Sequence, residues 1–346
     1  MAVKQDFLDR IERVCAGTLT AKALRQQIVE ILARAVPFDG YVFILTDPVT
    51  RVGTSPLADV PIPWPRLPEL VRWRYQTRPN RWTDLLDAGV AAASLVTATA
   101  GEPSRSLMWR HVLREVGVVD SAVAPFADRY GCWGFLDLWR TSGRFTHEEV
   151  EFLGRLHGAV TAGLRAALVR TFVDREDQLL PVGPAVVVLD AELQVRSQTA
   201  GAATALLRLN PPDEPMAPIP AAAYNVGAAL LAEEADVAVG PPWSRVHLGG
   251  SRWVTVKASR LAGQDIAVSI EPSTAAERMD LFARAHALSP REAEVMALLV
   301  VGLDTKQIAA RLVLSAHTVT DHVKAVLVKT GVRTRQVLLS RALGAA

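Results

Sequence analysis

The sequence predicts a soluble α+β protein of two or three domains that ends in a small all-helical module. The chain has 346 residues, of which 50% are apolar and 21% charged. It is therefore long enough to bury several cores, and its composition excludes a disordered polyelectrolyte. Strand-like alternation is interspersed with helical spacing up to about residue 272, whereas closely spaced helix-start signals fill the last 60 residues.

Charge is distributed unevenly along the chain. The formal net charge is only +2, yet residues 285–346 contain eight basic and four acidic residues, which gives +4 with His neutral. The preceding 284 residues therefore carry −2, and they hold all eight Trp, between Trp64 and Trp253. A small basic module after a large, slightly acidic body indicates that the C-terminal end binds nucleic acid.

Several classes of protein are excluded by composition. Two cysteines, Cys15 and Cys132, are too few for a disulfide scaffold or a Cys-rich metal site, and they fit a reducing compartment. The first residues lack the apolar core of a signal peptide, and residues 88–100 are too short and too rich in Ser and Thr to span a bilayer. We therefore expect a cytoplasmic protein with no membrane contact and no metal ligands.

The N-terminal body begins with a predicted helix over residues 20–35. Its apolar residues share one face: Leu24, Ile28, Ile31 and Ala35. A turn at Asp39-Gly40 precedes a strand over 41–45. Alternating apolar residues at 118–126 and 132–139 flank an Asp-Arg-Tyr-Gly turn, which predicts a β-hairpin.

A long helix towards residue 168 follows the hairpin. Thr146 and Glu149 form a capping box at its start, with Phe145 and Val150 as a hydrophobic staple. The order of a helix, a strand, a Trp-Gly-Phe-Leu strand, and Arg-Phe-Thr before Glu-Glu and a terminal helix resembles a GAF domain over residues 20–168. This resemblance implies a domain that binds a small molecule or chromophore, or that dimerises.

One strand of this body holds a candidate ligand pocket. Alternate residues of a strand share a face, so its four candidate residues point the same way: Trp133, Phe135, Asp137 and Trp139. An acid among three aromatics predicts a pocket in which Asp137 accepts a hydrogen bond or pairs with a cation. The alternative is core packing, with Asp137 bound to a loop N–H or an arginine. The aromatic segment 73–84 is either a cover over the sheet, a dimer face or part of the core.

The middle of the chain alternates strand and helix signals. Strands are predicted at 185–189, 193–197, 244–248, 253–259 and 266–270, with a helix at 202–209 and a proline-rich loop at 210–220. This order resembles a PAS-like domain over residues 180–272. A connecting helix at 273–287 then either transmits a signal, pairs with its mate in a dimer, or acts as a passive linker.

In the C-terminal module, capping residues predict the N-termini of three helices. Ser289 with Glu292 and Asp304 with Gln307 have capping-box spacing, and Ser315 precedes a third helix. The second and third helices are separated by Val313-Leu314, which is turn length for a helix-turn-helix. On pattern alone, a small helical bundle that binds a protein is an equal alternative.

Residues 288–343 resemble the LuxR-type helix-turn-helix. The motifs that carry the resemblance are Leu-Ser-Pro-Arg-Glu from 288, Lys-Gln-Ile-Ala from 306, Thr-Val from 318, His-Val from 322, Lys329 and Gly-Val from 331. The resemblance implies a four-helix, dimeric DNA-binding domain over residues 288–346 that binds double-stranded DNA. A homodimer would contact half-sites about one helical turn apart.

The resemblance also assigns roles on the third helix. Positions that contact bases in the family are Thr320, Asp321 and Lys324, and positions that contact the DNA backbone are Thr318, His322 and Lys329. Asp321 departs from the usual neutral or basic residue. It could accept a hydrogen bond from a cytosine amino group, or it could only orient Lys324 at helical spacing.

We therefore predict a transcription regulator whose GAF/PAS-like body senses a small molecule or partner and controls the helix-turn-helix. The alternative is a constitutive DNA-binding dimer in which the body serves only dimerisation or protein interaction. The chain lacks the early acid pair that is typical of a phosphorylated receiver domain. Its Trp73, Tyr75 and Asp84 do not match the spacing of acyl-homoserine-lactone receptors. No Gly-x-Ser-x-Gly, His-Glu-x-x-His or phosphate loop is present, so we expect no catalytic residues. The sequence identifies neither a cofactor nor the effector.

Overall fold

The computed structural model describes residues 2–173, 185–209, 219–237, 239–249 and 252–344. The chain divides into two compact units, each assembled from separated segments. The sheet unit comprises residues 1–167, 180–246 and 254–272, and the helical unit comprises residues 168–179, 247–253 and 273–346. Most of the predicted proline-rich loop and the first five residues of the predicted PAS-like range lie outside the described residues.

The first sheet has five strands in the order β2-β1-β5-β4-β3, and every pairing is antiparallel. Its strands are β1 Gly40–Thr46, β2 Gly53–Asp59, β3 Ala93–Ser94, β4 Asp120–Asp128 and β5 Gly131–Arg140. The predicted hairpin is confirmed as β4–β5. Strand β5 lies at the centre, between β1 and β4, and almost all of its residues are buried.

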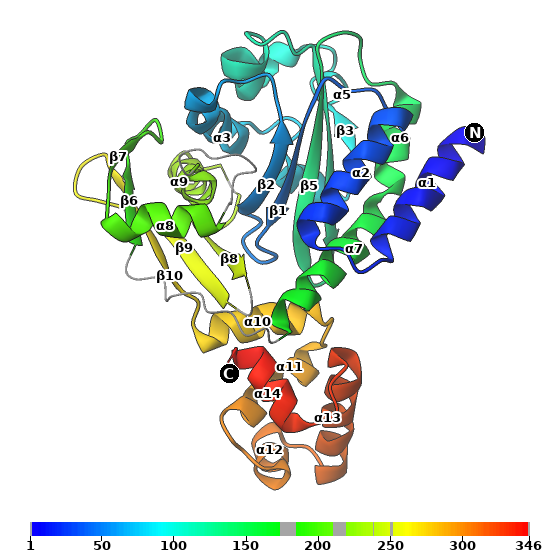
Figure 1. Ribbon diagram of the computed structural model, residues 1–346, viewed down its shortest axis with the longest axis vertical. Coiled ribbons are helices and arrows are strands. Elements are labelled where there is room, and N and C mark those ends of the chain that lie inside the picture. Colours follow the sequence, from blue (N-terminus) through cyan, green and yellow to red (C-terminus); the bar gives the residue numbers. More distant parts are fainter. Residues whose placement is uncertain (1, 174–184, 210–218, 238, 250–251, 345–346) are drawn as a thin grey trace. The chain divides into compact units, whose positions relative to one another are not determined.

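Helices cover both faces of this sheet. Four helices, shown along one face in Figure 1, are α1 Ala2–Cys15, α2 Ala21–Ala35, α6 His147–Arg155 and α7 His157–Val169. The predicted capping box of Thr146 and Glu149 is formed. Thr20, predicted as the first residue of its helix, is instead the N-cap of α2 and accepts a hydrogen bond from Ala23 N. Figure 1 shows α3 Leu67–Gln76 on the other side of the sheet. Two further short helices are α4 Trp82–Asp87 and α5 Leu95–Ala98.

The second sheet also has five antiparallel strands, in the order β7-β6-β10-β9-β8. Its strands are β6 Ala185–Leu189, β7 Val195–Gln198, β8 Trp243–Gly249, β9 Arg252–Arg260 and β10 Ile266–Pro272. The predicted helix is α8 Ala200–Leu209. The sequence does not predict α9 Ala221–Glu234, in which every residue from Ala221 to Ala232 is buried. A helix that is apolar on all sides shows no amphipathic stripe.

Buried polar contacts join the two sheets within the sheet unit. The Tyr75 hydroxyl on α3 accepts a hydrogen bond from Gly53 N at 2.8 Å and donates to Asn225 Oδ1 on α9 at 2.9 Å. Asp47, after β1, pairs with Arg245 on β8 at 2.7 Å, and both side chains are almost inaccessible. The two sheets are therefore packed as one unit, and the division into a GAF-like and a PAS-like domain stays a prediction.

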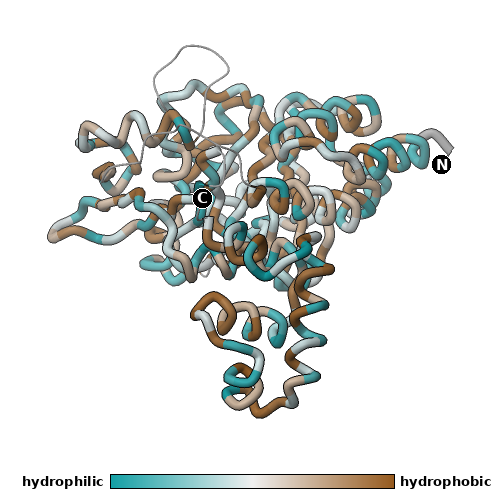
Figure 2. Tube along the Cα trace, turned by 60° about the horizontal axis from the view of Figure 1, so that its bottom comes forward, coloured by the Kyte–Doolittle hydropathy of each residue, from teal (hydrophilic) through white to brown (hydrophobic). Residues whose placement is uncertain are grey.

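The helical unit contains five helices after residue 273: α10 Ala275–Ala285, α11 Pro290–Val300, α12 Thr305–Leu312, α13 Ala316–Thr330 and α14 Arg335–Leu343. The predicted capping boxes of α11 and α12 and the Ser315 cap of α13 are formed. Figure 2 shows hydrophilic and hydrophobic residues mixed along these helices, as expected of elements with one buried face.

Helix α10 is part of the core of the helical unit. Leu281 and Phe282 are buried in one cluster with Leu338 and Ala342 of α14. Phe172 and Trp253, from the two shorter segments of the unit, belong to the same cluster, and their rings stack at 5.7 Å between centroids. The connecting helix therefore buries apolar surface instead of lying free.

No described helix combines the length and apolar character that crossing a bilayer requires. Within the same residues, no three His, Cys, Asp or Glu side chains gather as metal ligands would.

Candidate nucleic-acid interface and candidate ligand cavity

Helices α12 and α13 are joined by a sharp turn at Val313. This residue adopts the left-handed conformation (φ +55°, ψ +51°), which is rare for a β-branched residue, and its side chain is 90% exposed. Two residues later, Ser315 Oγ accepts a hydrogen bond from Thr318 N at 3.0 Å and starts α13. The turn and the cap together produce the helix-turn-helix that the sequence predicted.

Helix α13 buries one face and exposes the other. Val319, Val323 and Val326 are buried, the first two against α11 and α12. Opposite them, the side chains of His317, Asp321 and Lys324 are 87%, 54% and 72% exposed. The exposed face is polar and unobstructed within the helical unit, so it is available to a groove of DNA.

The predicted base-contacting residues lie together on this exposed face. Asp321 Oδ2 lies 3.0 Å from His317 Nδ1, and Asp321 Oδ1 lies 3.8 Å from Lys324 Nζ. Thr320 Oγ1 donates to Ala316 O at 2.9 Å, a bond within the helix. Exposed ion pairs contribute little to stability, so Asp321 is free to exchange either partner for DNA. Both interpretations of Asp321 remain predictions.

The predicted backbone-contacting residues differ in their surroundings. The Thr318 hydroxyl pairs with the Ser315 hydroxyl at 2.8 Å, and His322 is half-buried. Lys329 Nζ donates to Glu292 Oε2 at 2.6 Å and approaches Ala287 O at 3.4 Å. The sequence predicts Glu292 only as a capping residue, and the pairing with Lys329 leaves no local signal, because the two residues are 37 positions apart.

The carboxylate of Glu292 both caps α11 and pairs with Lys329. Its Oε2 accepts a hydrogen bond from Ser289 N at 2.6 Å as well as from Lys329. Burial raises the pKa of Glu292, but the hydrogen bonds from Lys329 and Ser289 outweigh burial and hold the pKa below its ordinary value. The carboxylate thus joins the end of α13 to the start of α11.

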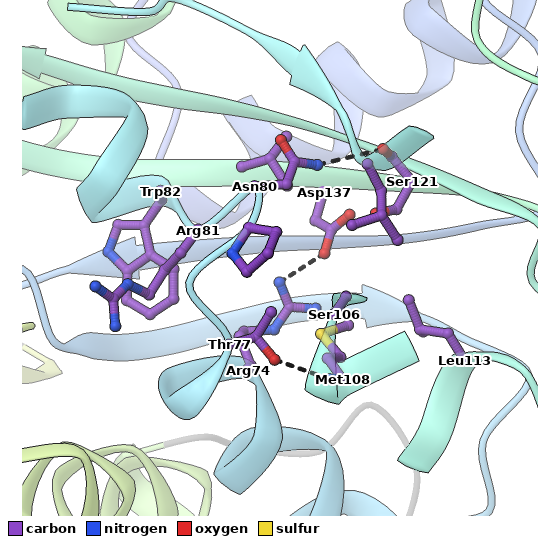
Figure 3. A pocket seen from close by; sticks show the side chains of 13 residues that line it. Arg74, Thr77, Asn80, Arg81, Trp82, Ser106, Met108, Leu113, Ser121 and Asp137 are labelled. Carbon is purple, nitrogen blue, oxygen red and sulfur yellow. Dashed lines mark hydrogen bonds and ion pairs between the residues drawn. The ribbon is translucent and has the colours of Figure 1, made fainter. Parts of the chain in front are cut away.

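A small cavity lies beside β5 in the sheet unit (Figure 3), with a volume of about 20 Å³. That is room for about one water molecule. Of the four residues predicted for a ligand pocket, only Asp137 lines this cavity. The ring of Phe135 instead stacks on that of Trp82, a lining residue, at 4.5 Å between centroids.

Asp137 is bound to an arginine, which is one of the two outcomes left open by the sequence. Arg74 Nη1 on α3 donates to Asp137 Oδ2 at 2.6 Å, and the residues are 8% and 1% exposed. Burial raises the pKa of Asp137 above its ordinary value, while Arg74 and the indole of Trp139 oppose the rise. In the sequence, Arg74 falls within the aromatic segment 73–84 and no pattern predicts a role for it.

The other two predicted pocket residues are core side chains. Trp133 Nε1 donates to Asp128 Oδ1 at 3.1 Å, near the β4–β5 turn, and Trp139 is fully buried. The aromatic segment is packed in the core at Tyr75 and Trp82, which are each 1% exposed and meet edge to face. Whether Trp133, Phe135, Asp137 and Trp139 serve a ligand stays a prediction.

Comparison with known proteins identifies the C-terminal segment. Residues 286–342 match the GerE family, described as bacterial regulatory proteins of the luxR family. This segment is therefore a LuxR-family DNA-binding domain. No curated protein matches the chain.

Three solved structures align with the chain at low similarity. The ligand-binding domain of VqsR from Pseudomonas aeruginosa is 12% identical, with a TM-score of 0.31 over 47% of this chain and 93% of that chain. SdiA in complex with octanoyl-rac-glycerol is 13% identical, with a TM-score of 0.32 over 99% and 93%. Escherichia coli SdiA is 14% identical, with a TM-score of 0.36 over 99% and 97%. Scores this low establish no common ligand.

Proposed function

We propose that this protein is a sequence-specific DNA-binding transcription regulator in which the sheet unit senses a small molecule or partner and controls the helical unit. The observation that carries the proposal is the exposed polar face of α13 within the LuxR-family domain. Base edges in a major groove present donors and acceptors that this face complements.

The proposed contacts follow from position on α13. Thr320, Asp321 and Lys324 would meet base edges, whereas Thr318 and His322 on the flank would meet phosphates. Lys329 would contact phosphate only after exchanging Glu292 for DNA, because its Nζ is 2.6 Å from that carboxylate. A single module covers few base pairs, so we propose a homodimer that contacts two half-sites.

The test begins with the full-length protein and a pool of random DNA duplexes. Sites enriched by binding define a consensus, and affinity for it is then measured at several salt concentrations. Lys324→Ala should weaken binding to the consensus by about 1–3 kcal/mol and relax the preference at one base position. Arg129→Ala is the matched control, because it removes an exposed cation from the β4–β5 turn of the sheet unit. An unchanged base preference in Lys324→Ala would reject the recognition face.

A second candidate function is a constitutive DNA-binding dimer whose sheet unit serves only association. The small size of the cavity favours it, since about 20 Å³ holds about one water molecule and no larger effector without rearrangement. The two candidates differ in one measurement. A regulator changes its affinity for the consensus when its effector is added, whereas a constitutive dimer keeps the same affinity with every small molecule tested.

A further inference from the structure

His317 lies in the middle of the exposed face of α13. At about 100° per residue around a helix, it points within about 60° of each residue predicted to contact bases, which are Thr320, Asp321 and Lys324. The residues predicted to contact the DNA backbone lie about 100–140° away on one flank, and they are Thr318, His322 and Lys329. The direction of His317 therefore groups it with the residues that would meet bases and not with those that would meet phosphates.

The position of His317 along α13 supports the same grouping. The helix begins at Ala316, directly after the Ser315 cap, so His317 lies in its first turn. Recognition helices contact base edges mainly through their N-terminal residues. The side chain of His317 is 87% exposed, whereas His322, the other histidine of this helix, is half-buried. His317 is therefore the histidine of α13 that is free to enter a groove.

Asp321 determines which ring nitrogen of His317 faces outward. Asp321 Oδ2 lies 3.0 Å from His317 Nδ1, whereas Asp321 Oδ1 lies 3.8 Å from Lys324 Nζ. A carboxylate only accepts hydrogen bonds, so a neutral imidazole bound to it carries its hydrogen on Nδ1 and a lone pair on Nε2. Nε2 is the distal ring nitrogen, and it forms no hydrogen bond with the residues that the structure describes. An exposed pair contributes little to stability, but this one orients an acceptor.

We propose that His317 is a specificity-determining residue whose Nε2 accepts a hydrogen bond from an exocyclic amino group in the major groove. Adenine N6 and cytosine N4 present such a donor there, whereas guanine and thymine present acceptors. The inference rests on the DNA binding in the proposed function, and it names the class of base at one position of the site. Asp321 is here a positioning residue, and its Oδ1 stays available to Lys324 or to a base.

Site selection from random duplexes is the first test, with the full-length protein at about pH 8, where free imidazole is neutral. His317→Ala removes the ring, and His317→Phe retains a ring without either nitrogen. Both variants should lose a preference for adenine or cytosine at one and the same base position. That position should lie within about three base pairs of the one that Lys324→Ala relaxes, because a helix rises about 10 Å between residues 317 and 324.

His147→Ala is the matched control for these variants. His147 also lies in the first turn of a helix, α6 of the sheet unit, and its side chain is 89% exposed. It likewise has a carboxylate four residues on, with Glu151 Oε1 at 3.9 Å from its Nε2. His147→Ala should keep the complete consensus of the wild type.

Base analogues then test the hydrogen bond itself. 2′-Deoxynebularine replaces the selected adenine, or 2′-deoxyzebularine replaces the selected cytosine, and each analogue lacks only the exocyclic amino group. The wild type should lose about fivefold more affinity on the analogue than His317→Ala loses, as expected for one hydrogen bond. Comparison of the two proteins on the same duplexes cancels any effect of the analogue on the DNA alone.

Three results would overturn the proposal. An equal loss of affinity of His317→Ala for every sequence would indicate a phosphate contact. Loss of a preference for guanine would show that the ring donates instead of accepting. Retention of the base preference by either His317→Ala or His317→Phe would show that no ring nitrogen contacts a base.

Variants of Asp321 test its positioning role. Asn retains an oxygen that accepts from His317 Nδ1, whereas Ala does not. Asp321→Ala should therefore lose the base preference that depends on His317, and Asp321→Asn should keep it. Loss in both variants, or in neither, contradicts the orientation of His317 by Asp321.

The same selection separates this inference from the function beneath it. A wild type that enriches no consensus rejects the regulator and, with it, the role of His317. A consensus that is identical for the wild type and His317→Ala rejects the role of His317 and keeps the regulator.

Discussion

Glu292 illustrates how one carboxylate can join two helices of the DNA-binding domain. It caps α11 through Ser289 N and pairs with Lys329 at the end of α13. Gln at this position retains capping-box geometry but lacks the charge. Glu292→Gln should therefore lower the free energy of unfolding of the helical unit by roughly 1 kcal/mol at pH 7, since Lys329 is partly exposed and screened. Thermal unfolding of the full chain measures this loss.

The same pair predicts a dependence on pH. Because the pKa of Glu292 is lower in the folded protein than its ordinary value of 4.5, its stabilisation is present above pH 4.5 and is lost as the pH falls through the folded value. The difference between wild type and Glu292→Gln should accordingly disappear under acidic conditions. A difference that is constant from pH 7 to acid would show that the charge of Glu292 contributes nothing.

Asp321 supports a prediction that separates its two interpretations. Removal of its charge should raise affinity for all DNA sequences at low salt, because the carboxylate repels phosphate. Site selection with Asp321→Asn then decides the role. If Asp321→Asn loses a preference for cytosine at one base position, Asp321 contacts that base directly. If the variant changes the preference only at the base position that Lys324→Ala also affects, Asp321 acts by orienting Lys324.

At the scale of elements, α9 fits closely against β2 in the sheet unit. A Cβ added at Gly53 would lie 2.6 Å from Asn225 Oδ1 and 2.5 Å from Ile44 Cδ1. Gly53→Ala should therefore lower the free energy of unfolding by about 1–3 kcal/mol, as overpacking does in other cores. Gly158→Ala on α7 is the matched control, because nothing lies within 4 Å of its added Cβ. Denaturant unfolding should show a lower free energy of unfolding for Gly53→Ala and a slightly higher one for Gly158→Ala.

Some elements of this fold can be predicted from neighbouring residues in the sequence, and others depend on contacts between distant residues. Helix caps such as Ser289–Glu292 and strands such as β1 and β5 were predicted within a few residues, because capping and alternation depend on neighbours in the chain. Helix α9 could not be found, since its uniform apolar character gives no period. The partner of Asp137 was left open for a related reason: Arg74 is 63 residues away, and only packing brings them together.

At the scale of the molecule, the helical unit draws its core from three separate segments. Phe172 contacts Trp253 and Phe282, with centroids 5.7 Å and 5.2 Å away. Phe172→Ala in the full chain should destabilise the helical unit by about 3–5 kcal/mol, because it leaves a cavity in that core. Val173→Ala, at a position 42% exposed, is the control and should change little. Hydrogen exchange of α10 amides should accelerate only in the first variant.

This discontinuous core also determines when the DNA-binding unit can fold during synthesis. Phe172 precedes Phe282 by 110 residues and Trp253 precedes it by 29. At roughly 5–20 residues per second, Phe172 is therefore made about 6–22 s before Phe282 and Trp253 about 1–6 s before it. Until α10 emerges, these two aromatic side chains have no core to enter. The DNA-binding unit therefore folds last. A chain terminated before α10 would expose the aromatic side chains of Phe172 and Trp253, which favour aggregation.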